Sequence, residues 1–278
     1  MSDALVPLLL AFADDELVLG HRHSEWTGWA PHIEEDVAFS SIAQDEIGHA
    51  AAYYSVASKI TGKDPNELAF GREPTEYRSA LLCERPNGDW AYTLARHWLY
   101  DHADALRLES MEGSANTDLA SLATKVRREE RYHLLHADMW LKRLAHGPVE
   151  GRTKLSRALA EAYSDALGLF EPIAEEEQAV KEGLVTVPSA ELQQRFADLV
   201  ATSLEEFDLA GAFLRLPEQK AEFVASSSGD LIESDAPNEE GGGPNESLGG
   251  RLGNHTPDFE ELWKVMTHTY REVPGATW

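Results

Sequence analysis

The stretch "QDEIGHA", residues 44–50, places a glutamate and a histidine three positions apart within an otherwise apolar helical pattern. Apolar residues around it recur at alternating spacings of three and four, which predicts one long helix over residues 33–60. Glu46 and His49 fall on the apolar face of this helix. The sequence therefore predicts that the helix turns a carboxylate and an imidazole toward its own core.

A second pair of the same kind occurs in "REERYHLLHA", residues 128–137. Here Glu130 and His133 lie on the apolar face of a helix predicted over residues 118–146. A single Glu-x-x-His match carries little information in a chain with 49 acidic residues and 11 histidines. Both pairs, however, lie on the core side of their helices and at about the same distance, 15 residues, from the turn before each helix.

Two further helices, predicted over residues 3–23 and 89–112, precede the helices that carry these pairs. Antiparallel helices place residues that are equidistant from a turn at the same height. Counting the same distance back from each turn reaches Glu16 in one helix and the neighbourhood of Asp101 in the other. The alternatives to Asp101 on nearby faces are Asp104 and His97.

These positions together form a candidate metal site. Four carboxylates at one level of a dry bundle repel one another and lose their hydration, so scattered core or surface polar groups are the weaker interpretation. Two divalent cations neutralise the charge, and oxygen and nitrogen ligands without thiolate suit iron, with manganese as the alternative. We predict two iron ions held by Glu16, Glu46, His49, Asp101, Glu130 and His133.

The acidic residues just before each ligand glutamate, Asp45 and Glu129, are candidates for orienting the histidines. A ligating imidazole usually donates its second N–H to a carboxylate. We expect Asp45 to support His133 and Glu129 to support His49. The other nearby histidines are expected to lie outside the site, namely His21, His23, His102 and His136.

The rest of the chain is also helical by pattern, which predicts an all-α bundle with additional C-terminal helices. These further helices are predicted over residues 153–182, 189–215 and 258–271. Residues 226–255 are rich in Gly, Ser, Pro and acidic residues and are expected to be disordered. The predicted organisation is therefore a bundle over residues 1–225, this insertion, and a C-terminal helix within residues 256–278 that packs back on the bundle.

Composition excludes several classes of function. The net charge of -25 opposes binding to nucleic acid or to an anionic membrane surface. The apolar N-terminal stretch lacks the basic residues of a signal peptide, and no apolar stretch is long enough to span a bilayer. The single cysteine, Cys83, fits a reducing compartment and is expected to be buried. We therefore expect a cytoplasmic protein.

Several long stretches resemble one known family, the C subunits of multicomponent ring 1,2-phenylacetyl-CoA epoxidases of aerobic phenylacetate breakdown. The resemblance covers nearly the whole chain except the insertion. The stretches that carry it are "LVLGHRHSEWTGWAP", "LAFGREPTEYRSALLCERPNGDWAYTLARHWLYDH", "EERYHLLHADMWLKRLAHG" and the terminal "PGATW".

The resemblance implies a ferritin-like fold and membership of a di-iron monooxygenase complex. It implies a homologous A subunit that usually holds the di-iron centre, a small B subunit, and an iron–sulfur flavin reductase that delivers electrons. Such a complex epoxidises the aromatic ring of phenylacetyl-CoA with O2. In this family the C subunit is commonly a structural subunit without metal ligands.

This sequence departs from that pattern because all six candidate ligands are present. The main interpretation is an oxygenase subunit that carries a di-iron site of its own. The alternatives are a metal-free scaffold of the same complex and a ferritin-type iron oxidase.

Overall fold

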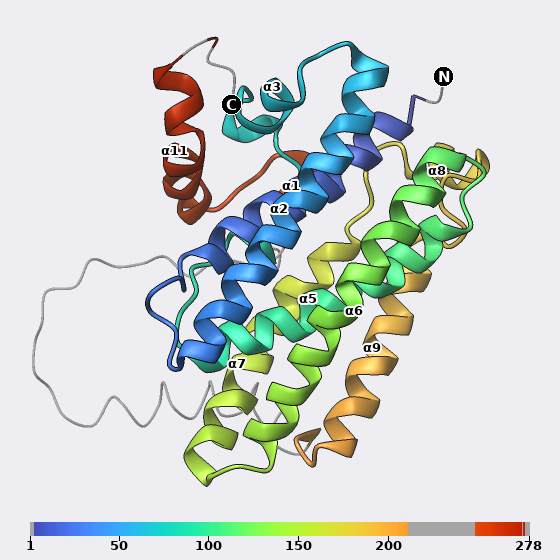
Figure 1. Ribbon diagram of the computed structural model, residues 1–278. Helices are drawn as coiled ribbons and strands as arrows, with labels where there is room; N and C mark the ends of the chain where they lie inside the picture. Colours follow the sequence, from blue (N-terminus) through green and yellow to red (C-terminus); the bar gives the residue numbers. More distant parts are fainter. Residues whose placement is uncertain (1–2, 211–247, 274, 276–278) are drawn as a thin grey trace, which may run out of the picture.

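The computed structural model describes residues 3–210, 248–273 and 275, and these residues form helices and connecting loops without any strand. Four long helices lie side by side as a bundle, and shorter helices pack against it (Figure 1). The predicted all-α, ferritin-like bundle with additional C-terminal helices is confirmed. None of the helices in the described part combines the length and apolar composition needed to cross a bilayer.

The four bundle helices begin and end within two residues of their predicted bounds. The first two pair with each other, and so do the last two. The residues predicted for the inner faces of the second and fourth helices are buried or half-buried, which confirms the periodicity. The helices are α1 (Leu5–Ser24), α2 (Ile33–Thr61), α5 (Trp90–Glu112) and α6 (Thr117–Ala145).

Helix α1 is enclosed on most sides, with 15 of its 20 residues buried. The buried set includes three consecutive acidic residues, and a buried carboxylate is tolerated only when it has partners of its own. Successive residues of a helix point in directions about 100° apart, so each of the three reaches different neighbours. Asp14 accepts from Arg72 and Tyr54, Asp15 accepts from Arg107 and Arg251, and Glu16 accepts from Tyr100.

The connection between α2 and α5 consists of three short helical segments. A C-terminal helix, α11, packs across them and ties the end of the described chain to the bundle. One of its anchors is the indole Nε1 of Trp263, which donates to the carbonyl of Arg72 at 3.0 Å. These elements are α3 (Pro65–Phe70), η1 (Pro74–Glu76), α4 (Leu81–Glu84) and α11 (Pro257–Glu272).

The prediction of a single helix over residues 153–182 is wrong. The chain instead forms α7 (Val149–Leu167), the short η2 (Gly168–Phe170) and α8 (Glu176–Lys181). Pro172 explains the interruption, because proline lacks an N–H and forces the residue before it out of the helical region. The preceding residue accordingly has an extended conformation, with φ -60° and ψ 124°.

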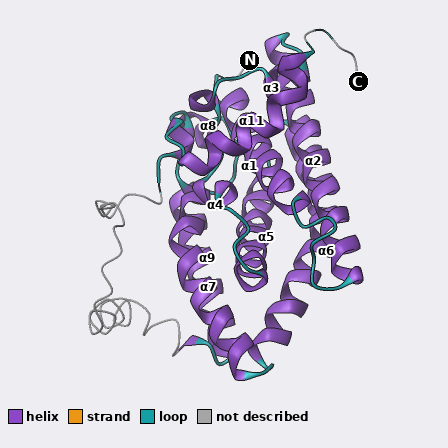
Figure 2. Ribbon diagram, turned by 90° about the vertical axis from the view of Figure 1, so that its left-hand side faces the viewer, coloured by secondary structure: helices purple, strands orange, loops and turns teal. Residues whose placement is uncertain are grey.

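The helix predicted over residues 189–215 is shorter in the structure, where α9 (Ser189–Glu206) ends and Asp208 adopts a positive φ of 55°. Residues 211–215 lie outside the described residues. Helices α7 and α9 lie beside α5 on the side of the bundle away from α2 (Figure 2).

The segment expected to be disordered, residues 226–255, lies outside the described residues up to position 247. The expectation of disorder is wrong for residues 248–255, because they include η3 (Gly250–Leu252) and contact the bundle. The backbone N–H of Gly249 donates to Glu171, and the buried Arg251 reaches Asp15. The C-terminal part that the structure describes, from residue 248 on, is therefore tied to the bundle.

Gly20 provides a test of how closely α1 and α2 pack. A Cβ atom at this position would lie 2.9 Å from Cγ1 of Ile47 and 3.2 Å from the carbonyl oxygen of Ala43. Gly20→Val is therefore expected to lower the free energy of unfolding by about 2 kcal/mol, because overpacking forces the helices apart. Urea denaturation measures the change. An unaltered or raised stability would contradict this account of the packing.

Gly48 supplies the matched control in α2. A Cβ atom added there would have no described atom within 4 Å, and the residue lies inside a regular helix. Gly48→Ala is expected to raise the free energy of unfolding by about 0.5–1 kcal/mol, because alanine loses less backbone entropy than glycine on forming a helix.

Candidate metal centre

The six predicted ligands come from the four bundle helices, and all six side chains are buried in the structure. Glu16 lies on α1, Glu46 and His49 on α2, and Asp101 on α5. The remaining two, Glu130 and His133, lie on α6. Each sits on the face of its helix that points to the middle of the bundle, so the helical periodicity alone accounts for their burial.

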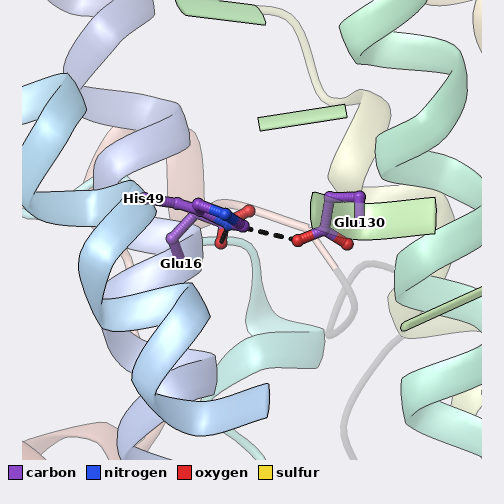
Figure 3. Close-up of side chains that lie close together, drawn as sticks. All are labelled: Glu16, His49 and Glu130. Carbon is purple, nitrogen blue, oxygen red and sulfur yellow. Dashed lines mark hydrogen bonds and ion pairs between the residues drawn. The ribbon is translucent and has the colours of Figure 1, made fainter. Parts of the chain in front are cut away.

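Three of the six converge closely. Nδ1 of His49 lies 3.2 Å from Oε2 of Glu16 and 3.1 Å from Oε1 of Glu130. Figure 3 shows these side chains pointing toward one another from α1, α2 and α6. One ligand atom from each residue lies within 4.8 Å of the other two, so the group can hold a metal ion.

Glu130 also links this group to the second histidine. Nδ1 of His133 lies 3.1 Å from Oε1 of Glu130, the same oxygen that faces His49. Both imidazoles therefore present Nδ1 to the centre of the site and turn Nε2 outward. A carboxylate between two imidazoles is well placed to be shared by two metal ions.

The outward ring nitrogens contact the two acidic residues expected to orient them. Nε2 of His49 lies 2.9 Å from Oε2 of Glu129, and Nε2 of His133 lies 3.5 Å from Oδ2 of Asp45. Each contact crosses between α2 and α6, and the carboxylate side chains are 42% and 50% exposed. A carboxylate in this position fixes the ring orientation and leaves the inner nitrogen free to bind a metal.

The other two predicted ligands are buried in the same region but face histidines. Oε2 of Glu46 lies 2.9 Å from Nδ1 of His23, and Oδ2 of Asp101 lies 3.3 Å from Nδ1 of His97. The tight group of Glu16, His49 and Glu130 includes neither of them. Their ligation of a metal stays a prediction.

The structure separates Asp101 from its alternative Asp104. Oδ1 of Asp104 accepts from Nη2 of Arg107 at 2.7 Å, so this acid is committed to an ion pair. Burial raises the pKa of Asp101 well above its ordinary value, and the neighbouring charge of Glu130 raises it further. Of the two acids, Asp101 is the one without a cationic arginine partner of its own.

Sequence reasoning missed a buried group of histidines next to the site. The expectation that His23 lies outside it is wrong, because His23 is fully buried against Glu46. His136 contacts none of the six predicted ligands and lies one residue further out, against His97. Nδ1 of His136 lies 3.3 Å from Nε2 of His97, and its Nε2 lies 2.8 Å from Oε2 of Glu35. The signal was available for His23, which follows Glu16 by two helical turns and so shares its face.

Several buried polar atoms of the site have no hydrogen-bond partner among the described residues, which fits a bound metal. A buried polar group without a partner costs free energy, so such atoms are rare in a native protein unless something else binds them. The donor types are carboxylate oxygen and imidazole nitrogen, the set that suits iron and manganese. Among them are Oε1 of Glu46, Oδ1 of Asp101 and Oε2 of Glu130.

The chain is similar to known proteins over nearly its whole length. Residues 1–226 match the family described as "Phenylacetic acid catabolic protein". The chain belongs to that family. The chain is also similar to the C subunit of the 1,2-phenylacetyl-CoA epoxidase of Escherichia coli (strain K12). That protein is 28% identical to this chain over 275 residues, which is 99% of each chain.

In this member of the phenylacetic acid catabolic family, the metal-free site must hold protons in place of metal ions. Burial raises the pKa of Glu46 well above its ordinary value. Burial alone would lower the pKa of His49, but hydrogen bonds and negative charge from Glu130 and Glu16 outweigh it and raise that pKa to about 12. In the same way the charge of Glu130 overcomes burial and raises the pKa of His133 to about 10.

These shifts predict how the stability of the metal-free protein depends on pH. The folded-state pKa values of His49 and His133 lie above their ordinary value, so the stability they contribute is complete below about pH 6.5 and is lost as pH rises. The raised pKa of Glu46 acts in the same direction, because its proton must also leave. We expect the free energy of unfolding to fall by at least about 2 kcal/mol between about pH 6.5 and 9.5.

Urea denaturation of chelator-treated protein at the two pH values measures this change. Protein loaded with iron under anaerobic conditions serves as the control, because bound cations replace the protons and weaken the pH dependence. A metal-free protein that became more stable at the higher pH would contradict the assignment of protonated histidines.

Proposed function

We propose that this chain is the C-type subunit of the multicomponent oxygenase that epoxidises the aromatic ring of phenylacetyl-CoA with O2. The observation that carries the proposal is the relative named as the C subunit of 1,2-phenylacetyl-CoA epoxidase, which aligns with this chain over 99% of both proteins. The family match over residues 1–226 supports it independently. The substrate comes from the relative's name and the reaction with O2 from the resemblance noted in the sequence, not from the geometry of the site.

Within this complex, we infer that Glu16, Glu46, His49, Asp101, Glu130 and His133 hold two iron ions. Two bound ferrous ions would supply electrons for the activation of O2. The inward Nδ1 atoms of both histidines and the shared position of Glu130 support the inference. Manganese suits the same donor set and is the alternative metal.

The surrounding side chains hold these ligands in place. The phenol of Tyr100 donates to Oε1 of Glu16 at 2.8 Å and leaves Oε2 facing His49. Glu129 and Asp45 fix the ring planes of His49 and His133 from outside. Such supporting contacts reduce the rearrangement that metal binding requires.

The same proposal includes the partners that the resemblance implies. They are a homologous A subunit, a small B subunit, and an iron–sulfur flavin reductase. We place the complex in the cytoplasm, where the buried and unpaired Cys83 is compatible with a reducing environment.

A metal-free scaffold subunit is the second candidate, and one specific observation favours it. Glu46 and Asp101 already contact His23 and His97, so two of the six ligands have neutral partners without any metal. In this version the chain supports the shape of the A subunit and has no chemistry of its own.

Reconstitution of the complex separates these two candidates. The chain is combined with its A-type partner, the B subunit and the reductase, and epoxidation of phenylacetyl-CoA is measured with wild-type chain and with Glu46→Ala. We expect no turnover when the chain is omitted and at least about a tenfold loss with Glu46→Ala, because a metal ligand is missing. Unchanged turnover with Glu46→Ala, together with no iron in the isolated chain, would establish the scaffold.

A further inference from the structure

The outer surface of α2 and α6 is the side of the bundle that the other described helices leave uncovered. Figure 1 views the molecule with these two helices in front, and in Figure 2 they form the right-hand edge with no helix beyond them. The contacts His49–Glu129 and His133–Asp45 bridge the two helices and mark their common boundary. We call this surface the α2/α6 face.

The part of this face on α2 is a second helical seam, parallel to the one that faces the core. Between residues 37 and 58, the only exposed charged side chain of α2 is Asp45, which contacts His133. The other exposed residues recur at alternating spacings of four and three, as in a helix that packs against another helix. They are Val37, Ser41, Gln44, Gly48, Ala51 and Ser55.

No contact within the described chain requires a glycine at position 48, in the middle of this seam. Gly20 is required because its missing Cβ makes room for α2, whereas a Cβ on Gly48 would have no described atom within 4 Å. Glycine inside a helix weakens the helix, so its presence calls for something that approaches the backbone closely. No described residue of the chain occupies this space, which leaves it open to a helix of another subunit.

The part of the face on α6 adds exposed apolar side chains. Tyr132, Leu135 and Met139 are exposed by 72%, 58% and 54%. The register fixed by His49–Glu129 and His133–Asp45 brings the level of Met139 within one turn of Val37, which is itself 65% exposed. Exposed apolar residues gathered across two adjacent helices are typical of a protein interface.

The charge on this face is opposite to that of the chain. The five most exposed charged residues of α6 between residues 121 and 143 are cations, although the net charge of the chain is -25. These residues are Lys125, Arg128, Arg131, Lys142 and Arg143. The acids Glu129 and Asp138 of the same stretch have side chains that are 42% and 49% exposed, and each contacts a histidine. A second copy of the chain packed symmetrically here would bring like charges together, whereas a different subunit with an acidic rim would complement them.

We propose that the α2/α6 face is the docking surface for the A-type subunit of the oxygenase. A helix of that subunit packs over Gly48 and against Leu135, and acidic residues beside it face Arg128 and its neighbouring cations. Docking there would also cover Glu129 and Asp45, the outer partners of the two histidines. This inference rests on the proposed function, because it takes its partner from that complex.

Binding of the A-type subunit to the full-length chain tests the proposal by calorimetric titration. Gly48→Leu, Leu135→Glu and Arg128→Glu are each expected to weaken binding at least about tenfold, since central interface residues dominate affinity. Gly48→Leu is the sharpest variant, because the space around Gly48 lets the free chain keep or raise its melting temperature while it loses affinity. The matched control is Val265→Glu, an exposed valine on α11, which should change affinity by less than about twofold.

Three results would overturn the proposal. If all three variants bind as the wild type does and remain folded by circular dichroism, the docking surface lies elsewhere although the complex forms. If the wild-type chain alone sediments as a dimer that Leu135→Glu dissociates, the occupant is a second copy. If the wild-type chain does not bind the A-type subunit at all, both this inference and the proposed function fail.

Discussion

Glu130→Ala is expected to reduce bound iron from about two ions per chain to well below one, the largest effect on metal binding of any single substitution in the site. Oε1 of Glu130 lies 3.1 Å from Nδ1 of both His49 and His133, so its removal takes a ligand from each predicted metal position. It also takes away the negative charge that raises the pKa of both imidazoles, which then lose part of their protonation. Metal analysis of anaerobically loaded protein measures the outcome.

The matched control for Glu130→Ala is Glu129→Gln on the same helix. Glu129 contacts the outer nitrogen of His49 and is not a predicted ligand. Its loss should weaken iron binding by about 10–100-fold and leave two iron ions bound at saturation, as for other carboxylates that orient a metal-bound histidine. If Glu130→Ala retained two iron ions, or if the wild-type chain bound none, the metal centre proposed for this chain would be rejected.

Asp15→Ala is expected to lower the free energy of unfolding by about 3–5 kcal/mol, because it leaves the buried guanidinium group of Arg251 without a carboxylate and that of Arg107 with Asp104 alone. Asp15 accepts from Nη1 of Arg107 at 2.6 Å, from both terminal nitrogens of Arg251 at 2.7 and 2.8 Å, and from the backbone N–H of Ala80 at 2.7 Å. All three charged side chains are at most 5% exposed. The loss should also loosen residues 248–255, which Arg251 ties to α1.

The pH dependence of stability gives an independent check on Asp15. Burial by itself raises the pKa of this carboxyl, but the charges of Arg251 and Arg107 outweigh burial and hold the pKa below its ordinary value. Its contribution to stability is therefore present above about pH 4 and is lost as pH falls through the lowered folded-state pKa. Asp15→Ala should remove this part of the acid sensitivity.

Glu191→Ala is the control for the ion pair of Asp15. Glu191 pairs with Arg195 on the surface of α9, and both side chains are largely exposed. Its removal should cost less than about 1 kcal/mol, because solvent screens an exposed pair. Urea denaturation of both variants at neutral pH makes the comparison. Equal losses in the two would contradict the role assigned to Arg251 and Arg107.

Much of the bundle followed from the sequence because helical periodicity is a local property. The spacing of apolar residues placed the four long helices within two residues of their observed ends and put all six predicted ligands on buried faces. The failure in the region of α7 and α8 also has a local cause, since Pro172 interrupts a pattern that otherwise continues as a helix.

The environment of the predicted site was harder to anticipate. His23 lies two turns from Glu16 on the same helix, but only its distance to Glu46 on α2 shows that it belongs to the site. Asp101 and Asp104 are both aspartates on nearby faces of one helix, so the sequence alone does not tell which of them faces the site. The ion pair of Asp104 with Arg107 distinguishes them. Such differences depend on which helix lies opposite and on the side-chain rotamers, which a period of 3.6 residues does not specify.

Antiparallel helices, two Glu-x-x-His pairs on inner faces and the resemblance to one component of an epoxidase could all be read from the amino-acid sequence. The packing of the helices was needed to see that Glu16, His49 and Glu130 meet while Glu46 and Asp101 turn toward histidines. The same packing brings Arg251 to Asp15, 236 positions away along the chain, and so neutralises the buried carboxylate. The reason is that the direction of a side chain is set by its own helix, whereas the distance between two side chains is set by how separate helices pack.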